Sequence, residues 1–215
     1  MEIDAPSTDR QQPKLEILEL DKEKIRFILS NCHVSVANAL RRIMLAEIPT
    51  MAIHMVNIYE NTSSLPDQFL SHRLGLIPLV SYQESKFNNT WECNCMANQQ
   101  CKECKQYYQI HVRNDTQDTI EVTSKDIVSQ DPYINQEIDP VMPVKMYSPL
   151  DPNREVGIPI VKLSKNQEIK IHMEAYKGIG KMHAKWSPVS IASFSYEPKV
   201  ELDPERALKL PINVK

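Results

Sequence analysis

The sequence predicts a mixed α+β fold in which strands outnumber helices. Most apolar residues alternate with polar ones, which is the period of a half-buried strand. Residues 34–48 and 67–76 instead have the character of helices. Four glycines against fifteen prolines favour stiff connections over flexible linkers. A length of 215 residues fits one large domain or two small ones.

The first elements follow one another closely. Residues 1–13 are polar and contain proline, so we expect a flexible tail. Two alternating runs on either side of the charged segment Asp21–Lys24 predict a β-hairpin. Val34–Ile48 lacks glycine and proline, has an apolar helical face and is followed by Pro49, which predicts a helix. Met51–Tyr59 is apolar on both faces and predicts a buried strand.

The middle of the chain predicts a short helix and two strands. Asp67–Leu76 is the helix candidate, because glycine and proline stop it. The alternating runs Tyr108–Val112 and Ile120–Val122 predict two strands that pair with each other. Residues 131–157 are rich in proline and aspartate, so we expect them to be mostly irregular.

The C-terminal part predicts three more strands. Two lie around Ile158–Ile160 and Ile169–Met173. The glycine-containing stretch Lys177–Lys181 interrupts the alternation and predicts a turn. Ala192–Tyr196 carries the last alternating run and predicts the final strand.

Four of the five cysteines lie within twelve residues, as a C-x-C followed by a C-x-x-C: Cys93, Cys95, Cys101 and Cys104. Four thiolates can surround one Zn²⁺ tetrahedrally, and they leave no position open to a substrate, so the predicted site is structural. The loop between the pairs has no core-forming run, so a metal is expected to order it. Lys102 and Lys105 would offset the negative charge of the thiolates. Two disulfides or unligated thiols are the alternatives.

Composition and charge exclude several classes of protein. A net charge of −3 argues against a chain that binds nucleic acid through a basic surface. The N-terminus lacks the basic and apolar regions of a signal peptide, and no run approaches the roughly 20 apolar residues of a membrane span. We therefore expect a cytosolic or nuclear protein with no membrane partner.

No group of residues predicts catalysis. Gly178-Ile179-Gly180-Lys181 lacks the spacing and the following hydroxyl of a phosphate-binding loop. Cys32 is followed by His33, but adjacent residues rarely aim at each other, so a buried thiol is the better interpretation. The six histidines stand at no ligand spacing.

Two consecutive arginines, Arg41 and Arg42, stand in the middle of the first predicted helix. In an otherwise apolar helix they must either reach solvent or face a partner. The residues alone favour solvent.

Four ordered segments resemble the α-type assembly subunits of cellular RNA polymerases. Val36–Ile43, followed by Ala46–Pro49, resembles the signature helix of that family. His72–Leu79 matches the second signature of its eukaryotic and archaeal branch. The cysteine loop lies where the RNA polymerase II branch, the third-largest subunit, carries zinc, and Lys177–Pro188 is similar to a further segment of that branch.

The resemblance implies a non-catalytic assembly subunit of nuclear DNA-directed RNA polymerase II, which transcribes mRNA genes. Such a subunit forms a heterodimer with a smaller α-like subunit and docks on the second-largest subunit. It thereby joins the largest subunit and the rest of the complex, and it meets nucleic acid only through the complex. The homologous subunit of polymerases I and III, or a free zinc-containing binding module, are the alternatives.

The resemblance also implies how the domains divide. Residues 14–49 and 177–215 would form a discontinuous dimerisation domain from the hairpin, the helix and the C-terminal strands. A mostly β insert domain, residues 50–176, would interrupt it and hold the zinc loop at 91–105.

The resemblance assigns partner contacts to the first helix, at Asn38, Leu40, Arg41, Arg42 and Ile43. It reverses the interpretation of the arginines, which would then face the large-subunit interface. Two departures from the family accompany it. The spacing from Cys95 to Cys101 is slightly longer than usual. The chain ends soon after Glu205–Leu208, where family members continue through a strand and a long helix. We therefore expect either an incomplete product or a variant that dimerises through a smaller surface.

Overall fold

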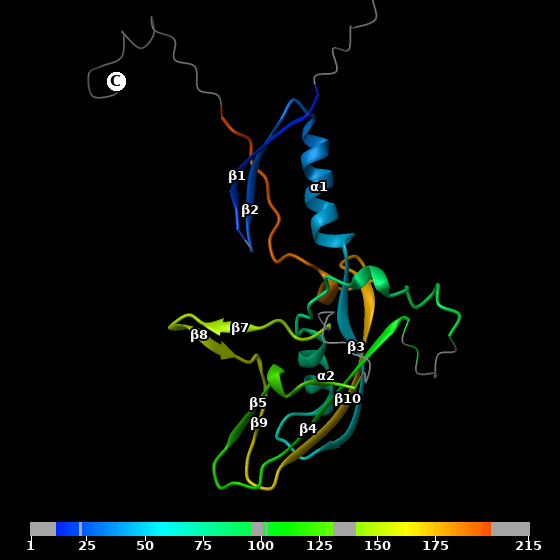
Figure 1. Cartoon of the computed structure of the whole chain (residues 1–215), viewed down its shortest axis with the longest axis vertical. Helices are drawn as coiled ribbons and strands as arrows, with labels where there is room; N and C mark the ends of the chain where they lie inside the picture. Colours follow the sequence, from blue (N-terminus) through cyan, green and yellow to red (C-terminus); the bar gives the residue numbers. More distant parts are fainter. Residues whose placement is uncertain (1–11, 22, 96–100, 102, 131–140, 199–215) are drawn as a thin grey trace, which may run out of the picture. The chain divides into compact units, whose positions relative to one another are not determined.

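The computed structural model describes residues 12–21, 23–95, 101, 103–130 and 141–198 (Figure 1). These residues fall into two compact units, one within 1–41 and 192–215 and the other within 42–191. Most of the predicted N-terminal tail, the loop 96–100, Lys102 and Glu205–Leu208 lie outside the described residues. The domain boundaries implied by the family resemblance stay a prediction.

The predicted α+β class is confirmed. The described residues form ten strands and two α-helices. No helix among them is long and apolar enough to cross a membrane.

The first unit contains the predicted hairpin. β1 (Lys14–Leu20) and β2 (Ile25–Ser30) pair antiparallel, with Leu15 opposite Leu29 and Ile17 opposite Phe27. The register shifts between Ile17 and Glu19. This bulge places Leu20 on the same face of the hairpin as Leu15 and Ile17, because the extra residue shifts the side-chain alternation by one position.

Helix α1 spans Val34–Ala46, and the boundary between the two units falls within it. His33 caps its start, because the Nδ1 atom accepts a hydrogen bond of 3.2 Å from the backbone N–H of Ser35. The helix ends two residues earlier than predicted, since the next strand begins at Pro49. No residue of α1 is buried.

The second unit is built on an antiparallel sheet with the strand order β3–β10–β4–β6. Its strands are β3 (Pro49–Asn61), β10 (Glu168–Ile179), β4 (Lys105–Arg113) and β6 (Val128–Ser129). Strand β3 was predicted to be buried on both faces, and this is wrong for its outer face. Met55 and Tyr59 are 46% and 64% exposed.

The predicted pairing of the runs around Tyr108 and Ile120 is also wrong. Both strands exist, but β4 pairs with β10 and β6, whereas β5 (Ile120–Thr123) pairs with β9 (Pro159–Leu163). Asn114 explains the difference, because it is buried in the connection between them. Its Nδ2 atom donates to the carbonyl oxygens of Asp118 at 2.7 Å and Leu163 at 2.9 Å, which directs the chain toward β9.

Three further expectations need correction. The stretch expected to be irregular contains a hairpin of β7 (Met146–Ser148) and β8 (Asp151–Val156). Strand β10 continues through the predicted turn as far as Ile179. Residues 192–196 form no strand, because no described strand edge pairs with them, and alternation alone cannot build a ladder.

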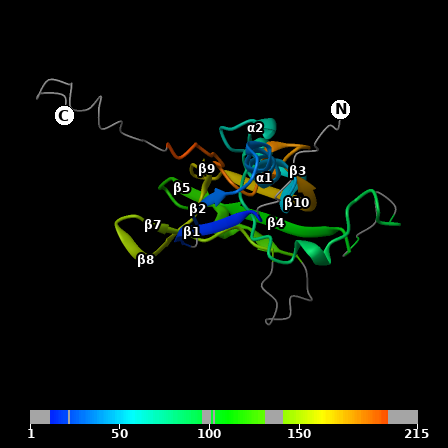
Figure 2. The same cartoon turned by 90° about the horizontal axis from the view of Figure 1, so that it is seen from above.

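The core of the second unit lies between the sheet and α2 (Asp67–Gly75), which packs on β3 and β9. Leu70 and Leu74 are the fully buried residues of that helix. In Figure 2, α2 lies on one side of β3, β10 and β4. The largest fully buried side chains of this core are Ile53, Leu70, Leu74, Tyr108, Ile110, Ile127, Ile160, Leu163, Ile169, Ile171 and Met173.

Candidate functional site

The structure brings the four clustered cysteines together. The Sγ atoms of Cys93 and Cys101 are 3.5 Å apart, and those of Cys95 and Cys104 are also 3.5 Å apart. All four Sγ atoms lie within 4.8 Å of one another. A disulfide requires a sulfur–sulfur distance of about 2.05 Å, so these thiols are free. The cluster can hold a metal ion.

The donor set and its spacing fit one tetrahedral ion. Zn–S bonds of about 2.3 Å place the sulfur atoms of a regular tetrahedron about 3.8 Å apart. The sulfur–sulfur distances in the cluster, from 3.5 Å to at most 4.8 Å, bracket that value. The first pair of cysteines comes from the turn after Thr90, and Cys104 directly precedes β4.

Hydrogen bonds join the two cysteine turns to each other and to β4. The N–H of Asn88 donates to the carbonyl of Glu103 at 2.8 Å, and the N–H of Cys93 donates to the carbonyl of Asn89 at 3.2 Å. The N–H of Cys101 donates to the hydroxyl of Tyr107 on β4 at 3.0 Å. The ligands of the second pair are therefore fixed to the sheet independently of a metal.

The pKa values of Cys101 and Cys104 are shifted in opposite directions. Burial raises the pKa of Cys101, but hydrogen bonds from the backbone of Glu103 and from Cys93 outweigh it and lower the pKa to about 7. Burial and the neighbouring thiols raise the pKa of Cys104. A metal binds thiolates, so it would overcome the burial of Cys104 and release protons on binding.

Lys105, which was predicted to offset the charge of the thiolates, forms an ion pair with Glu174. Its Nζ atom lies 3.2 Å from Oε2 of Glu174, and the side chain is 8% exposed. Burial lowers the pKa of Lys105, but the hydrogen bond to Glu174 outweighs it and the net shift is upward. The pair joins the start of β4 to β10, because Lys105 lies on β4 and Glu174 on β10. Tyr176 also donates its hydroxyl to Glu174 at 2.6 Å.

The residues predicted to bind partners lie on α1. Nε and Nη2 of Arg41 donate to Oδ1 of Asn38 at 3.2 Å and 3.0 Å. Leu40 is half-buried, whereas Arg42 and Ile43 are exposed. Neither arginine forms an ion pair within the described part of the chain. Their role in partner binding stays a prediction.

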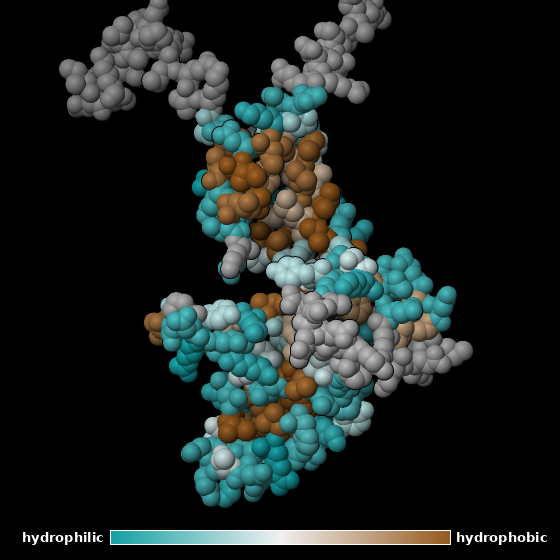
Figure 3. Space-filling view, viewed as in Figure 1, coloured by the Kyte–Doolittle hydropathy of each residue, from teal (hydrophilic) through white to brown (hydrophobic). Residues whose placement is uncertain are grey.

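An apolar surface on the hairpin was missed from the sequence. Figure 3 shows apolar side chains gathered over β1, β2 and α1. The hairpin surface, as defined here, consists of Leu15, Ile17, Leu18, Leu20 and Ile25. Each of these side chains is at least half exposed. The available signal was the pair Leu18 and Leu20, which breaks the alternation set by Leu15 and Ile17.

The part of the chain that carries the cysteine cluster matches a known protein family. Residues 56–192 match the family described as RNA polymerase Rpb3/RpoA insert domain, and they include the four cysteines. This chain belongs to the Rpb3/RpoA family. The resemblance to the α-type polymerase subunits is therefore confirmed.

Curated relatives extend the Rpb3/RpoA match beyond the insert domain. A protein of Tetrahymena thermophila named conjugation stage-specific protein is 50% identical, over 89% of this chain and 62% of its own. The DNA-directed RNA polymerase II subunit rpb3 of Dictyostelium discoideum is 45% identical, over 91% of this chain and 62% of its own length. The DNA-directed RNA polymerase subunit Rpo3 of Methanosphaera stadtmanae is 34% identical, over 89% of this chain and 64% of its own length. The chain thus spans about three fifths of the length of these relatives.

The other segments that resemble the Rpb3/RpoA family have structural roles. Arg73 of α2 donates from Nη2 to the carbonyl of Pro159 at 2.6 Å, which ties the helix to β9. A Cβ atom on Gly178 would lie 2.5 Å from the indole of Trp186, and one on Gly180 would lie 2.3 Å from the carbonyl oxygen of Leu45. These glycines permit close packing, which explains why β10 continues through the predicted turn.

The structure also settles two other sequence features. His33 hydrogen-bonds Ser35 as a helix cap, so it is not arranged as a base for Cys32. The histidines looked scattered in the sequence, but His54, His72 and His183 line one pocket with Lys185. Sequence spacing gave no signal for this pocket, because its residues come from distant segments.

Proposed function

We propose that this chain is a non-catalytic assembly subunit of DNA-directed RNA polymerase II that acts in the nucleus. Its membership of the Rpb3/RpoA family supports this, as does its 45% identity to a relative named as a polymerase II subunit. The proposed partners are a smaller α-like subunit, the second-largest subunit and, through them, the largest subunit. Nucleic acid is met only within the complex.

The exposed hairpin surface is the observation that carries the proposal. Five large apolar side chains at half exposure or more are unusual for a free protein and indicate a surface that a partner covers. Completing the burial of each stabilises a complex by about 1 kcal/mol, or about 5 kcal/mol together. Association itself costs about 4–15 kcal/mol. The hairpin surface alone is therefore too small for a stable heterodimer.

The first helix supplies the further contacts in this proposal. Leu40 and Ile43 add apolar area to the contact with the α-like subunit. Arg41 and Arg42 dock on the second-largest subunit, where carboxylates would receive their guanidinium groups. The hydrogen bonds from Arg41 to Asn38 hold one guanidinium in place on the helix.

The four cysteines hold one structural Zn²⁺ in this proposal. Four thiolate ligands close the coordination sphere, so the ion joins the turn at Cys93 and Cys95 to the start of β4 and offers no site to a substrate. The hydrogen bond from Cys101 to Tyr107 orients the second pair toward the ion.

Charge placed on the hairpin surface tests the assembly role. The tagged chain with Leu15→Asp and Ile17→Asp should lose the α-like subunit in affinity purification, because two carboxylates would be buried in the interface. Leu150→Asp is the matched control, since Leu150 is 97% exposed in the β7–β8 hairpin. Equal recovery of the α-like subunit with both variants would contradict the proposed interface.

Metal analysis of the purified chain tests the zinc site. We expect one zinc per wild-type chain and none after Cys101→Ser with Cys104→Ser. Cys32→Ser is the control, because Cys32 lies outside the cluster. Unchanged zinc in the double variant would refute the ligand assignment.

The same purifications determine which class of polymerase the chain belongs to. An Arabidopsis thaliana relative at 42% identity is named for polymerases II, IV and V. Mass spectrometry of the co-purified largest subunit distinguishes these classes from one another and from polymerases I and III.

A further inference from the structure

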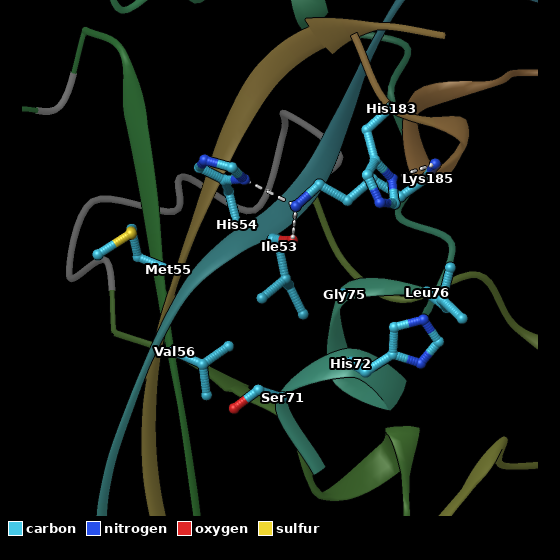
Figure 4. A pocket seen from close by; sticks show the side chains of 10 residues that line it. All are labelled: Ile53, His54, Met55, Val56, Ser71, His72, Gly75, Leu76, His183 and Lys185. Atoms are coloured by element: carbon cyan, nitrogen blue, oxygen red, sulfur yellow. Dashed lines mark hydrogen bonds between the residues drawn. The ribbon is translucent and has the colours of Figure 1, made fainter. Parts of the chain in front are cut away.

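A pocket of about 320 Å³ lies in the second unit, away from the cysteines (Figure 4). Strand β3, the end of α2 and the 3₁₀ turn Ala184–Trp186 form its walls. The Lys185 pocket, as named here, is defined by Ile53, His54, Met55, His72, Leu76, His183 and Lys185.

The ammonium group of Lys185 is held firmly in this pocket. Nζ donates to the carbonyl of Ile53 at 2.9 Å and lies 2.8 Å from Nδ1 of His54 (Figure 4). It also lies 4.5 Å from the ring centroid of Trp186, over the buried indole. An ammonium has only hydrogens to offer, so Nδ1 of His54 accepts and that imidazole is neutral.

No carboxylate compensates this cation. The pocket is lined by no aspartate or glutamate, and Lys185 forms no ion pair within the described residues. Lys105 is the contrasting case, because Glu174 lies 3.2 Å from its Nζ atom. Burial lowers the pKa of Lys185. A half-buried ammonium without a counter-charge is destabilised, and an arriving anion would relieve this.

Two exposed apolar side chains line the pocket beside its exposed histidines. Met55 and Leu76 are 46% and 51% exposed on opposite sides of it. A cation at the base and apolar groups at the rim together match an aliphatic chain that ends in a carboxylate.

We propose that the Lys185 pocket receives an aspartate or glutamate side chain of a partner protein. The carboxylate binds Nζ of Lys185, and the aliphatic stem packs against Met55 and Leu76. This inference rests on the pocket alone and is independent of the polymerase proposal.

Charge and chemistry favour a protein carboxylate over other ligands. Nucleic acid needs several cations along a groove, whereas this pocket offers one lysine in a chain of net charge −3. A metal cation is disfavoured, because the ammonium of Lys185 occupies Nδ1 of His54.

Zero-length crosslinking of the native complex tests the proposal. The tagged full chain is purified with its partners and treated with a carbodiimide, which joins a lysine amine to a carboxylate in direct contact. We expect an amide between Lys185 and an acidic residue of another protein. In parallel, acetylation of Lys185 should be at least about ten-fold slower in the complex than in the isolated chain. Lys162, whose side chain is 72% exposed, is the internal reference.

Two variants separate binding from folding. Lys185→Met keeps the packing on Trp186 and removes the charge, so its complex should lose the crosslinked partner at moderate salt. Lys185→Arg keeps the charge and should retain it. Circular dichroism verifies that both variants fold. Equal partner recovery with Lys185→Met and wild type would overturn the proposal.

The possible outcomes distinguish this inference from the proposed function. If polymerase subunits are recovered but Lys185 is acetylated as fast in the complex as in the isolated chain, the pocket proposal is refuted and the proposed function is not. A Lys185 crosslink to a protein outside the polymerase supports the pocket, whereas the absence of all polymerase subunits from the same purification contradicts the proposed function. Protection of Lys185 that disappears after nuclease treatment assigns the pocket to nucleic acid and overturns the carboxylate.

Discussion

The contact between Gly178 and Trp186 gives a sharp prediction about stability. Gly178→Ala would place a Cβ atom 2.5 Å from the indole. The indole cannot move away easily, because it is 3% exposed and its Nε1 atom donates to the carbonyl of Tyr176 at 3.0 Å. Overpacking of this kind costs about 1–3 kcal/mol. Trp186→Ala removes the ring itself and costs about 3–5 kcal/mol.

The two substitutions should not be additive. Once Trp186 is alanine, the space beside residue 178 is open, and Gly178→Ala becomes neutral or stabilising by up to about 1 kcal/mol. The double variant should therefore match Trp186→Ala alone, which gives a coupling energy of about 1–3 kcal/mol. Urea unfolding followed by far-ultraviolet circular dichroism measures all four proteins. Fluorescence is unsuitable, because Trp186 is one of two tryptophans.

Gly157→Ala is the matched control for this cycle. Its Cβ atom would lie 2.4 Å from Oγ1 of Thr123, a clash of the same kind that does not involve Trp186. Its cost should be the same in the wild type and in Trp186→Ala. The reasoning is refuted if Gly178→Ala costs as much in the absence of the indole as in its presence.

Three further predictions concern the second unit. Lys105→Met leaves the carboxylate of Glu174 without its cationic partner and should cost about 3 kcal/mol in urea unfolding, most of which Glu174→Leu in the same chain should restore. A persistent loss in the double variant would contradict the pairing. Asn114→Ala removes two donated bonds, including that to Leu163, and should lower the unfolding free energy by about 2–3 kcal/mol, whereas an unchanged urea midpoint would argue against its role. Burial, then Lys185 and His183, hold the pKa of His54 below its ordinary value of 6.5, so the unfolded chain takes up that proton more readily and stability should fall as the pH drops through 6.5. His54→Gln should weaken this pH dependence, and an unchanged slope would refute the assignment.

Local patterns predicted the elements whose structure depends on neighbouring residues. The hairpin, α1, β3 and α2 were found because alternation, helical spacing and the stop signals at Pro49 and Gly75 act over a few residues. The four cysteines were found because metal ligation imposes a short spacing.

Features that depend on distant contacts were missed or misassigned. The pairing of β5 with β9 follows from one buried amide, Asn114, which reaches Leu163. The continuation of β10 depends on Trp186 filling the space beside Gly178. The Lys185 pocket joins Ile53 and His54 of β3 to a residue 132 and 131 positions further along the chain, so no sequence spacing could predict it.

Affinity purification of the tagged wild-type chain from its native cells tests the central claim most directly. Mass spectrometry of the eluate should identify the small α-like subunit and the second-largest and largest subunits of RNA polymerase II, in amounts equal to the tagged chain. Recovery of the folded, zinc-containing chain without any polymerase subunit would contradict the proposed assembly role.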